Sequence, residues 1–378
     1  MNTIIILSTV HPYDDPRVFH RQARSLAKKH RVEMHICAPF EYRRFSPSLT
    51  VLGLPEWQSK SSRINTYLAL LKRLPALQGQ VYILHDPELL PLVPLLKTWK
   101  RGRVVYDIHE NYVEMIQEKL WIPAPVRNVV ARIYQLVEAV ALRWVDMIWY
   151  PVDDIGRRYR TVPGVKKCRI RNVPHLAQFA GLKTEGKKEN LLVCLGYLID
   201  DRGIAQLIEA LGMLAPRYPD LRMVFVGAFQ SREFEARITQ LISRLGLDKR
   251  VTVTGKVPYE QVADWLVRAK VGLLNYLPIP NNVHGLPNKL FEYMAAGLPV
   301  VASHFKNYAE VVEGTGCGVL VDPTRPEEIS RAIAFLLENE EIRHSMGQRG
   351  RKAVRERFCW EHEENILLSA VDELLNRT

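Results

Sequence analysis

Short apolar runs alternate with amphipathic stretches along both halves of the chain. Short apolar runs between turn signals are typical of buried parallel strands, and apolar residues every three to four positions predict helices. In the first half, the predicted strands are Thr3–Leu7, Val32–Cys37, Val81–Leu84, Val104–Tyr106 and Met147–Tyr150, and the predicted helices are Arg17–Lys29, Glu88–Trp99 and Val126–Trp144. In the second half, the predicted strands are Leu191–Leu195, Met223–Val226, Val251–Thr254, Gly272–Leu274, Val300–Ala302 and Gly318–Val321, with helices Ile204–Leu214, Glu233–Leu245 and Pro326–Leu337 between them.

Each half therefore predicts a doubly wound α/β unit, and 378 residues are too many for one ordinary core. The polar segment His175–Asn190 shows no period, and we interpret it as the linker between the two units. We expect an N-terminal domain at residues 1–175 and a C-terminal domain at residues 190–358. Ligands of open α/β sheets bind at the carboxyl ends of the strands, so two such domains predict an active site in a cleft between them.

The composition is that of a folded soluble protein, with 47% hydrophobic and 25% charged residues. The five cysteines form no CxxC pair, which favours reduced, buried thiols over disulfides or zinc. The N-terminus leads directly into a strand and no apolar run reaches the roughly 18 residues of a membrane helix. These features predict a cytoplasmic protein.

The net charge of +11 is concentrated in the first half of the sequence. Residues 1–178 carry 27 Lys and Arg against 15 Asp and Glu, whereas residues 179–378 carry 25 against 26. Such an excess indicates an anionic partner, which can be a nucleic acid, a membrane surface or a phosphorylated ligand.

One stretch of the second half carries most of the chemical information. It begins at His284 and continues Gly-Leu-Pro-Asn-Lys-Leu-Phe-Glu292, which predicts a loop followed by a helix. Gly285 allows close backbone approach, and the free N–H groups at the helix start form an anion site to which Lys289 adds a cation. Glu292, one turn further on, suits the hydroxyls of a ribose. The alternative is that Lys289 and Glu292 form a surface ion pair on an ordinary helix.

The whole window resembles the donor-binding signature of family-4 glycosyltransferases, which are retaining enzymes with the GT-B fold of two Rossmann-like domains. The stretch from Gly196 to Gly203 resembles the family element that holds the donor diphosphate, with Arg202 in place of the usual Lys and Tyr197 in place of an Arg. The resemblance also implies that a last helix, at residues 360–378, packs back on the first domain. The donor-binding residues that it implies are Gly196, Arg202, His284, Gly285, Leu286, Asn288, Lys289, Leu290 and Glu292.

The family signature is Glu-x7-Glu, and this chain departs from it. Glu292 is the second Glu, whereas the position of the first is occupied by His284. That first Glu contacts the donor sugar in the family, so the departure leaves the identity of the sugar open.

Polar clusters follow three predicted strands of the first half, around His11, His85 and His109. His109 matches a family histidine near the reacting centre and is the candidate catalytic residue; the alternative is a loop histidine bonded to backbone. The acceptor-side candidates are His11, Asp14, Asp15, Arg17 and Glu110. For Asp15, which precedes Pro16, the alternative is a helix N-cap.

The resemblance implies retaining transfer of a sugar from a UDP- or GDP-linked donor to a glycan or lipid-linked acceptor in polysaccharide or glycolipid synthesis. Arg202, Lys289 and the helix start would stabilise the leaving diphosphate, so no metal and no further cofactor is expected. A nucleotide-sugar epimerase or a phosphorylase on the same fold is the alternative. No nucleic-acid module is recognisable, and the basic first half instead favours peripheral contact with the inner face of an anionic membrane. The alternative is that its cations form ordinary solvated helix faces.

Overall fold

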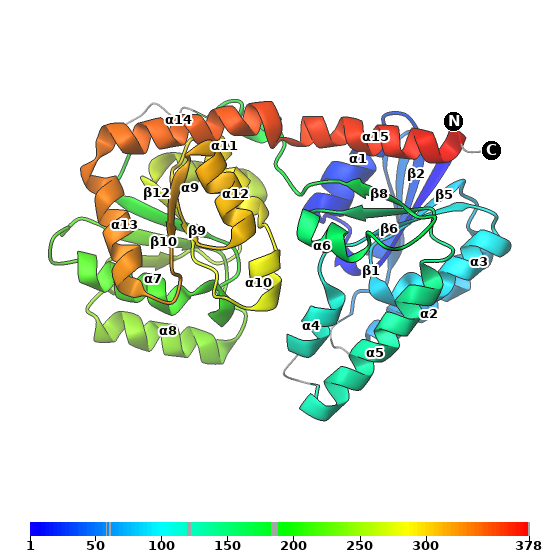
Figure 1. Ribbon diagram of the computed structural model, residues 1–378, viewed down its shortest axis with the longest axis horizontal. Coiled ribbons are helices and arrows are strands. Elements are labelled where there is room, and N and C mark those ends of the chain that lie inside the picture. The colour runs from blue at the N-terminus through cyan, green and yellow to red at the C-terminus, as the bar shows by residue number, and fades with distance from the viewer. Residues whose placement is uncertain (58, 60–61, 119–121, 183–187, 377–378) are drawn as a thin grey trace. The chain divides into compact units, whose positions relative to one another are not determined.

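The computed structural model describes residues 1–57, 59, 62–118, 122–182 and 188–376, and the chain divides into two compact units (Figure 1). Unit 1 comprises Met1–Asn172 and Glu361–Thr378, and unit 2 comprises Val173–Trp360. The expected domains are residues 1–175 and 190–358, so unit 2 begins 17 residues before the expected start of the second domain, at the edge of the expected linker. Phe179, in the middle of the predicted linker, packs in the core of unit 2, while residues 183–187 of that linker lie outside the described residues.

Unit 1 is built on an eight-stranded sheet in the order β3-β4-β2-β1-β5-β6-β7-β8. Neighbouring strands are parallel except β3 and β4, which are antiparallel. The strands are β1 (Thr3–Pro12), β2 (Arg31–Cys37), β3 (Tyr42–Ser46), β4 (Leu49–Leu54), β5 (Val81–Leu84), β6 (Arg103–Asp107), β7 (Met147–Tyr150) and β8 (Lys166–Arg169). The helices are α1 (Arg24–Leu26), α2 (Arg63–Arg73), α3 (Val93–Thr98), α4 (Tyr112–Glu118), α5 (Ala124–Ala141), α6 (Asp153–Arg158) and α15 (Trp360–Asn376), with 3₁₀ turns at Leu74–Ala76 and Pro87–Leu92 and a π-helix at Pro16–Ala23.

Unit 2 has a six-stranded parallel sheet in the order β11-β10-β9-β12-β13-β14, which is the strand order of a Rossmann fold. Its strands are β9 (Leu191–Leu195), β10 (Arg222–Val226), β11 (Val251–Val253), β12 (Val271–Leu274), β13 (Val300–Ser303) and β14 (Gly318–Val321). Its helices are α7 (Ile204–Leu214), α8 (Arg232–Arg244), α9 (Tyr259–Arg268), α10 (Pro280–His284), α11 (Asn288–Ala295), α12 (Lys306–Thr315), α13 (Pro326–Glu338) and α14 (Glu340–Arg357), with 3₁₀ turns at Leu176–Phe179 and Asp200–Arg202.

The sheet of unit 2 is covered by helices on both faces. Side chains of β9 alternate between two apolar clusters: Val193 and Leu195 pack with α11, α12 and α14, whereas Leu192 and Cys194 pack with α7, α8 and α13. This alternation follows from the two-residue period of a strand. It also explains why these strands are continuous apolar runs in the sequence.

Two segments of unit 1 that the sequence predicts as single helices contain helix types other than the α-helix. The helix expected at Arg17–Lys29 is a π-helix at Pro16–Ala23 followed by the short α1, and the helix expected at Glu88–Trp99 is a 3₁₀ turn followed by α3. Prolines at positions 91 and 94 supply no backbone N–H, which removes α-helical hydrogen bonds from the second segment. Apolar periodicity predicts which face is buried but does not distinguish these helix types.

The strands β3, β4 and β8 and the helix α2 are absent from the predicted elements. The strand β3 is mostly exposed and reads Tyr-Arg-Arg-Phe-Ser, and β8 reads Lys-Lys-Cys-Arg, so neither has an apolar run to reveal it. Both are edge strands, where one side of the backbone and much of the surface remain in water.

The last helix, α15, belongs mainly to unit 1. Its residues Leu367, Val371 and Leu374 are fully buried. Buried Glu363 accepts a hydrogen bond from the backbone N–H of Arg171 at 2.8 Å and pairs with its guanidinium at 3.2 Å. No helix of the described residues is long and apolar enough to span a membrane.

Candidate active sites

In both units, the residues of interest lie where the strand order reverses. In unit 2 this point lies between β9 and β12, and in unit 1 it lies between β1 and β5. The connections that follow these strands leave toward opposite faces of the sheet, so a crevice opens at the carboxyl ends of the two strands. Gly196 follows β9 directly, and His85 and Asp86 follow β5 directly.

Two cations converge on Gly196 in unit 2. Gly196 has a φ of 103°, in the left-handed region that favours glycine. A Cβ at this position would overlap the Cε atom of Lys289 and the Nη1 atom of Arg202. Any side chain at position 196 would therefore occupy the space that the two cations share.

These two cations lack a carboxylate partner. Arg202 donates to the carbonyl of Tyr197 at 2.8 Å and lies over the ring of Tyr276, but no ion pair involves Arg202 or Lys289 in the part of the chain that the structure describes. The predicted alternative, a surface ion pair between Lys289 and Glu292, is thus not formed. Two like charges held close together without a counter-charge favour the binding of an anion.

Glu292 lies in the same helix, α11, and is buried. Its Oε1 atom accepts a hydrogen bond from Nδ2 of Asn288 at 2.5 Å. The helix begins after Pro287, which occupies the N-cap position, so its first backbone N–H groups have no partner within the helix. Anion binding at this helix start is consistent with the predicted donor site.

The remaining predicted donor residues surround α11. His284 ends α10, and its carbonyl accepts a hydrogen bond from Nδ2 of Asn307 at 2.9 Å. A Cβ at Gly285 would lie 2.7 Å from the carbonyl oxygen of Asn281. Leu286 packs against the core and Leu290 is fully buried, so any contact of Leu290 with a ligand depends on its backbone.

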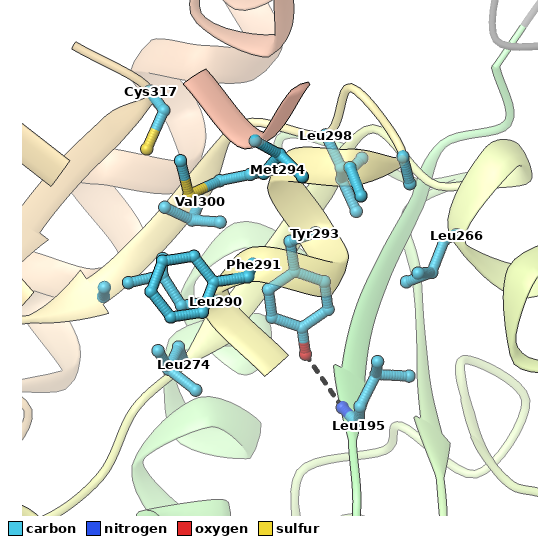
Figure 2. Close-up of a cluster of buried hydrophobic side chains, with 14 of the residues drawn as sticks. Leu195, Leu266, Leu274, Leu290, Phe291, Tyr293, Met294, Leu298, Val300 and Cys317 are labelled. Atoms are coloured by element: carbon cyan, nitrogen blue, oxygen red, sulfur yellow. Dashed lines mark hydrogen bonds between the residues drawn. The ribbon is translucent and has the colours of Figure 1, made fainter. Parts of the chain in front are cut away.

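Tyr293, which the sequence analysis does not single out, joins α11 to the sheet. Figure 2 shows its ring inside the apolar cluster, with the hydroxyl directed at the backbone nitrogen of Leu195. The hydroxyl accepts a hydrogen bond from that N–H at 2.9 Å and donates one to the carbonyl of Leu273 at 3.1 Å. Leu195 directly precedes Gly196 in the chain. The contact therefore fixes the position of α11, which carries Lys289, relative to the turn at Gly196.

Two buried asparagines hold the loop that carries Arg202. Asn275 donates to the carbonyls of Gly203 at 3.3 Å and Pro323 at 3.1 Å, and Asn282 donates to the carbonyl of Asp201 at 3.0 Å. No motif reveals either asparagine, because each acts on a loop more than seventy residues earlier in the chain.

Unit 1 contains a pocket of about 940 Å³ at its own switch point. Its polar end includes His11, Asp86, Glu88, His109 and Glu110. Its other walls are apolar side chains, mostly from α4 and α5. Of the residues predicted for catalysis and the acceptor, His11, His109 and Glu110 thus line one pocket.

His109 contacts a buried cluster beneath the pocket. Its Nε2 atom lies 3.0 Å from Nδ1 of His85 and 3.4 Å from Oδ2 of Asp107. Burial lowers the pKa of His109 to about 4, although the Asp107 carboxylate opposes the shift. At neutral pH the imidazole is therefore uncharged and can accept or donate a proton.

Arg17 holds the carboxylate of Asp107. Its Nη2 atom lies 2.7 Å from Oδ1 and its Nε atom 3.2 Å from Oδ2. Burial would raise the pKa of Asp107, but the Arg17 guanidinium and His109 hold it well below its ordinary value. Arg17 is almost fully buried, so its role is to position this cluster rather than to contact an acceptor.

His85, Asp107 and His109 also have the composition of a metal site, with their ligand atoms within 4.8 Å of one another. However, Oδ2 of Asp107 already accepts hydrogen bonds from Arg17 at 3.2 Å and from Nε2 of Gln22 at 2.6 Å. A guanidinium on the same carboxylate neutralises the charge that a metal ion would use. The hydrogen bonds account for the cluster without a metal.

His11 has the opposite electrostatic environment from His109. Its Nδ1 atom lies 3.1 Å from Asp15, and its Nε2 atom lies 3.7 Å from Asp86. Burial opposes protonation, but the hydrogen bond to Asp15 and the charge of Asp86 raise the pKa of His11 above its ordinary value. The rings of His11 and His109 are 4.7 Å apart, so two imidazoles whose pKa values are displaced in opposite directions face the same pocket.

Asp14 and Asp15 differ in their surroundings. Asp15 accepts hydrogen bonds from the backbone N–H groups of Arg17 and Val18, both at 2.8 Å, so it is the N-cap that the alternative interpretation describes. Asp14 is exposed and does not line the pocket. Arg63 and Glu88, which form an ion pair at the pocket wall, were not among the predicted site residues, and nothing in the local sequence around Arg63 marks it.

Comparison with known proteins shows which proteins this chain is similar to. Residues 182–353 match the family described as glycosyl transferases group 1. Curated relatives include the alpha-D-kanosaminyltransferase of Streptomyces kanamyceticus, 25% identical over 193 residues that cover 48% of each chain. A GDP-mannose-dependent phosphatidylinositol monomannoside mannosyltransferase of Mycobacterium tuberculosis is 27% identical over 53% of this chain and 51% of its own. The phosphatidyl-myo-inositol mannosyltransferase of Mycobacterium leprae is 24% identical over 85% and 84%.

The chain spans about half the length of the first two of these relatives. Among solved structures, sucrose-phosphate synthase from Thermosynechococcus elongatus superposes with a TM-score of 0.80 at 18% identity and full coverage of both chains. HepE of Anabaena in complex with UDP and glucose superposes with a TM-score of 0.70 at 16% identity, covering 98% of this chain and all of its own. These findings confirm the predicted GT-B fold of two Rossmann-like domains and the resemblance to group 1 glycosyltransferases.

Proposed function

We propose that this protein is a retaining glycosyltransferase that moves a sugar from a nucleotide diphosphate sugar to a glycan or lipid-linked acceptor. The observation that carries the proposal is the convergence of Arg202 and Lys289 on Gly196 without a carboxylate partner. As the glycosidic bond breaks, negative charge grows on the leaving diphosphate. Two fixed cations and a helix start at that position stabilise this charge most strongly in the transition state.

This arrangement supplies the positive charge that a metal ion would otherwise provide, so we propose that transfer is metal-independent. The donor is UDP- or GDP-linked. The M. tuberculosis relative is named as GDP-mannose-dependent, and HepE is described with UDP and glucose. In our proposal, Glu292 accepts hydrogen bonds from the ribose, and neutral His109 lies close to the reacting centre.

Binding of nucleotide sugars to charge-removing variants tests the donor site. Arg202→Met and Lys289→Met should each weaken binding of the preferred member of a UDP-glucose and GDP-mannose pair by about 10–100-fold, as expected for a lost charge-assisted hydrogen bond. Thermal shift and calorimetry measure the effect. Lys249→Met, at an exposed position of the same unit, is the matched control and should bind as the wild type does. Wild-type affinity for the nucleotide sugar in both site variants would show that the diphosphate does not bind at Arg202 and Lys289.

An epimerase or a phosphorylase on the same fold remains the second candidate. Incubation with the preferred nucleotide sugar alone separates the classes, because an epimerase interconverts the sugar without any acceptor. A phosphorylase would instead depend on inorganic phosphate. Full activity in excess EDTA supports the metal-independent mechanism, and the anomeric configuration of the product, read by NMR, tests retention.

We also propose that unit 1 contacts the inner face of an anionic membrane through α5. Val129, Leu136 and Val140 form an apolar stripe on this helix and are each more than half exposed. The exposed cation Arg132 lies on the same helix, and exposed Arg143 lies two residues after its end, whereas the one acidic residue of the helix, Glu138, is buried. An apolar stripe flanked by cations favours insertion at the surface of an anionic bilayer.

Co-sedimentation with vesicles tests this contact. The wild type should bind phosphatidylglycerol-containing vesicles at low salt, and Leu136→Asp should reduce the bound fraction severalfold. Equal binding to purely zwitterionic vesicles would argue against the electrostatic part of the contact, and no binding at all would argue against the membrane proposal.

A further inference from the structure

We propose that the unit 1 pocket binds an acceptor in which a hydroxyl-bearing head is joined to a hydrocarbon chain. This inference rests on the proposed function and selects the lipid-linked class from the acceptors that it allows. The pocket's lining has a polar end and apolar walls, and each part indicates a different portion of the ligand.

The polar end is suited to hydroxyl groups rather than to a phosphate. Arg63 is paired with Glu88, and His11 is paired with Asp15. Arg63 and His11 therefore already have carboxylate partners, and Asp86 and Glu110 add further carboxylate oxygens to the lining. Carboxylates and neutral imidazoles accept hydrogen bonds from hydroxyls, whereas carboxylates repel a phosphate.

The apolar walls are formed mainly by α4 and α5. Met115 and Ile116 come from α4, and Val130, Ile133 and Val137 come from α5. A monosaccharide at the polar end would leave these side chains in contact with water. Hydrocarbon buried against them contributes favourable free energy in proportion to its area.

The size and the surroundings of the pocket agree with a ligand that carries a hydrocarbon chain. The volume of about 940 Å³ lies near the upper end of the range for small-molecule sites, which is roughly 300–1,000 Å³. The stripe formed by Val129, Leu136 and Val140 is on the same helix as the pocket wall, one residue away from Val130 and Val137. An alkyl chain too long for the pocket, unlike an octyl chain, would meet this second apolar surface.

Calorimetry with a matched pair of glycosides tests the proposal. Octyl β-D-glucopyranoside, kept below its micellar concentration, and methyl β-D-glucopyranoside present the same head with and without a hydrocarbon chain. The octyl compound should bind at least about a hundredfold more tightly, with a negative heat-capacity change, because the chain is removed from water. Equal affinity for the two compounds would overturn the proposal.

Two variants of α5 separate the pocket from general adsorption. Ile133→Asp, at a lining residue that is 55% exposed, should weaken binding of octyl glucoside at least about tenfold, since a carboxylate resists burial beside hydrocarbon. Leu136→Asp is a matched change at a residue that is 68% exposed and lies outside the pocket, so binding should change less than about twofold. An equal loss of octyl glucoside affinity in both variants would show that the ligand adsorbs to the surface of α5, and it would overturn the assignment of the pocket as the binding site.

A thermal-shift assay with UDP-glucose and GDP-mannose distinguishes failure here from failure of the proposed function. Both α5 variants should keep the wild-type nucleotide-sugar response, because the donor residues lie in unit 2. If nucleotide sugar binds but octyl glucoside does not, the acceptor class is wrong and the transferase proposal stands. If octyl glucoside binds but no nucleotide sugar does, the transferase proposal fails, and with it the assignment of the ligand as an acceptor.

Discussion

Single side chains set the charge state of both candidate sites. In unit 1, two imidazoles whose rings are 4.7 Å apart have pKa values displaced in opposite directions, because His11 lies beside carboxylates and His109 is dominated by burial. In unit 2, the hydroxyl of Tyr293 fixes the distance between the turn at Gly196 and helix α11, which carries Lys289. Both effects are local enough to be tested by single substitutions.

The pKa of His109 predicts a pH dependence of stability. Its value in the folded protein is about 4, below the ordinary 6.5, so the unfolded chain takes up this proton first as the pH falls. The stabilisation by neutral His109 is thus complete above about pH 6.5 and is lost between pH 6.5 and 4, by up to about 3 kcal/mol. Urea unfolding at pH 7 and pH 4.5 should show this loss in the wild type and a smaller one in His109→Asn.

The matched control is His344→Asn, at an exposed histidine of unit 2. It should retain the wild-type pH dependence. An unchanged dependence in His109→Asn would mean that other groups produce the acid sensitivity.

Tyr293→Phe should lower the free energy of unfolding by about 1–3 kcal/mol, because it leaves the N–H of Leu195 and the carbonyl of Leu273 buried without a partner. Urea unfolding measures the change, and nucleotide-sugar affinity should fall with it. Tyr218→Phe removes a hydroxyl that bonds Glu338 at the surface and should cost far less. Similar effects of the two changes would show that the hydroxyl of Tyr293 is not a structural contact.

At the scale of elements, the π-helix of unit 1 is joined to the sheet by one buried ion pair. Arg17, in its first turn, binds Asp107 at the end of β6 and donates to the carbonyl of Ile170 after β8 at 3.1 Å. Gln22, five residues further along the same helix, binds the same carboxylate at 2.6 Å. A spacing of five residues suits the wider turn of a π-helix, and such turns are frequent at functional sites.

Asp107→Asn should therefore destabilise unit 1 by about 3–5 kcal/mol, since it leaves the guanidinium of Arg17 buried without a counter-charge. Urea unfolding measures the loss. Asp153→Asn breaks the exposed pair with Arg169 and should cost less than about 1 kcal/mol. A loss of similar size in both variants would argue that burial adds nothing to the Arg17–Asp107 pair.

At the scale of the whole molecule, charge is distributed differently from what the two halves of the sequence indicate. Unit 1, with α15 included, has 28 Lys and Arg against 20 Asp and Glu, whereas unit 2 has 24 against 21. The acidic α15 neutralises part of the basic excess, through pairs such as Lys28–Glu364 at 2.5 Å and Lys29–Asp372 at 3.0 Å (Figure 1). Less charge is thus available for a membrane than the first half alone predicts, which makes the apolar stripe of α5 the more important part of that proposal.

Helix α15 is a structural part of unit 1, so a cavity created by truncating one of its buried side chains should destabilise that unit alone. Leu374→Ala should cost about 2–5 kcal/mol, whereas Ile366→Ala on the same helix, at a largely exposed position, should cost little. Hydrogen exchange measured by mass spectrometry should show faster exchange in the strands of unit 1 and unchanged exchange in those of unit 2. Loss of protection in both units would show that they unfold together.

The sequence by itself determined the strands of unit 2 and its helices α7, α8 and α13 to within one residue, together with the loop and helix that carry the donor residues. Apolar runs, glycines and prolines act on their own neighbours, so β9, α7 and the start of α11 can be predicted without any partner. Edge strands such as β3, the π-helix and the boundary inside the predicted linker were not predicted, because apolar patterning encodes burial and not the identity of the packing partner.

Only the tertiary structure decided which residues meet. Lys289 and Arg202 converge because β9 and β12 are neighbours in the sheet, and the unit 1 pocket exists because α4 and α5 pack beside the ends of β1 and β5. Strand order is a property of long-range pairing, and the contacts that it creates join residues far apart in the chain. The sequence therefore determined the chemistry available to this protein, and the folding of the two sheets decided where that chemistry is concentrated.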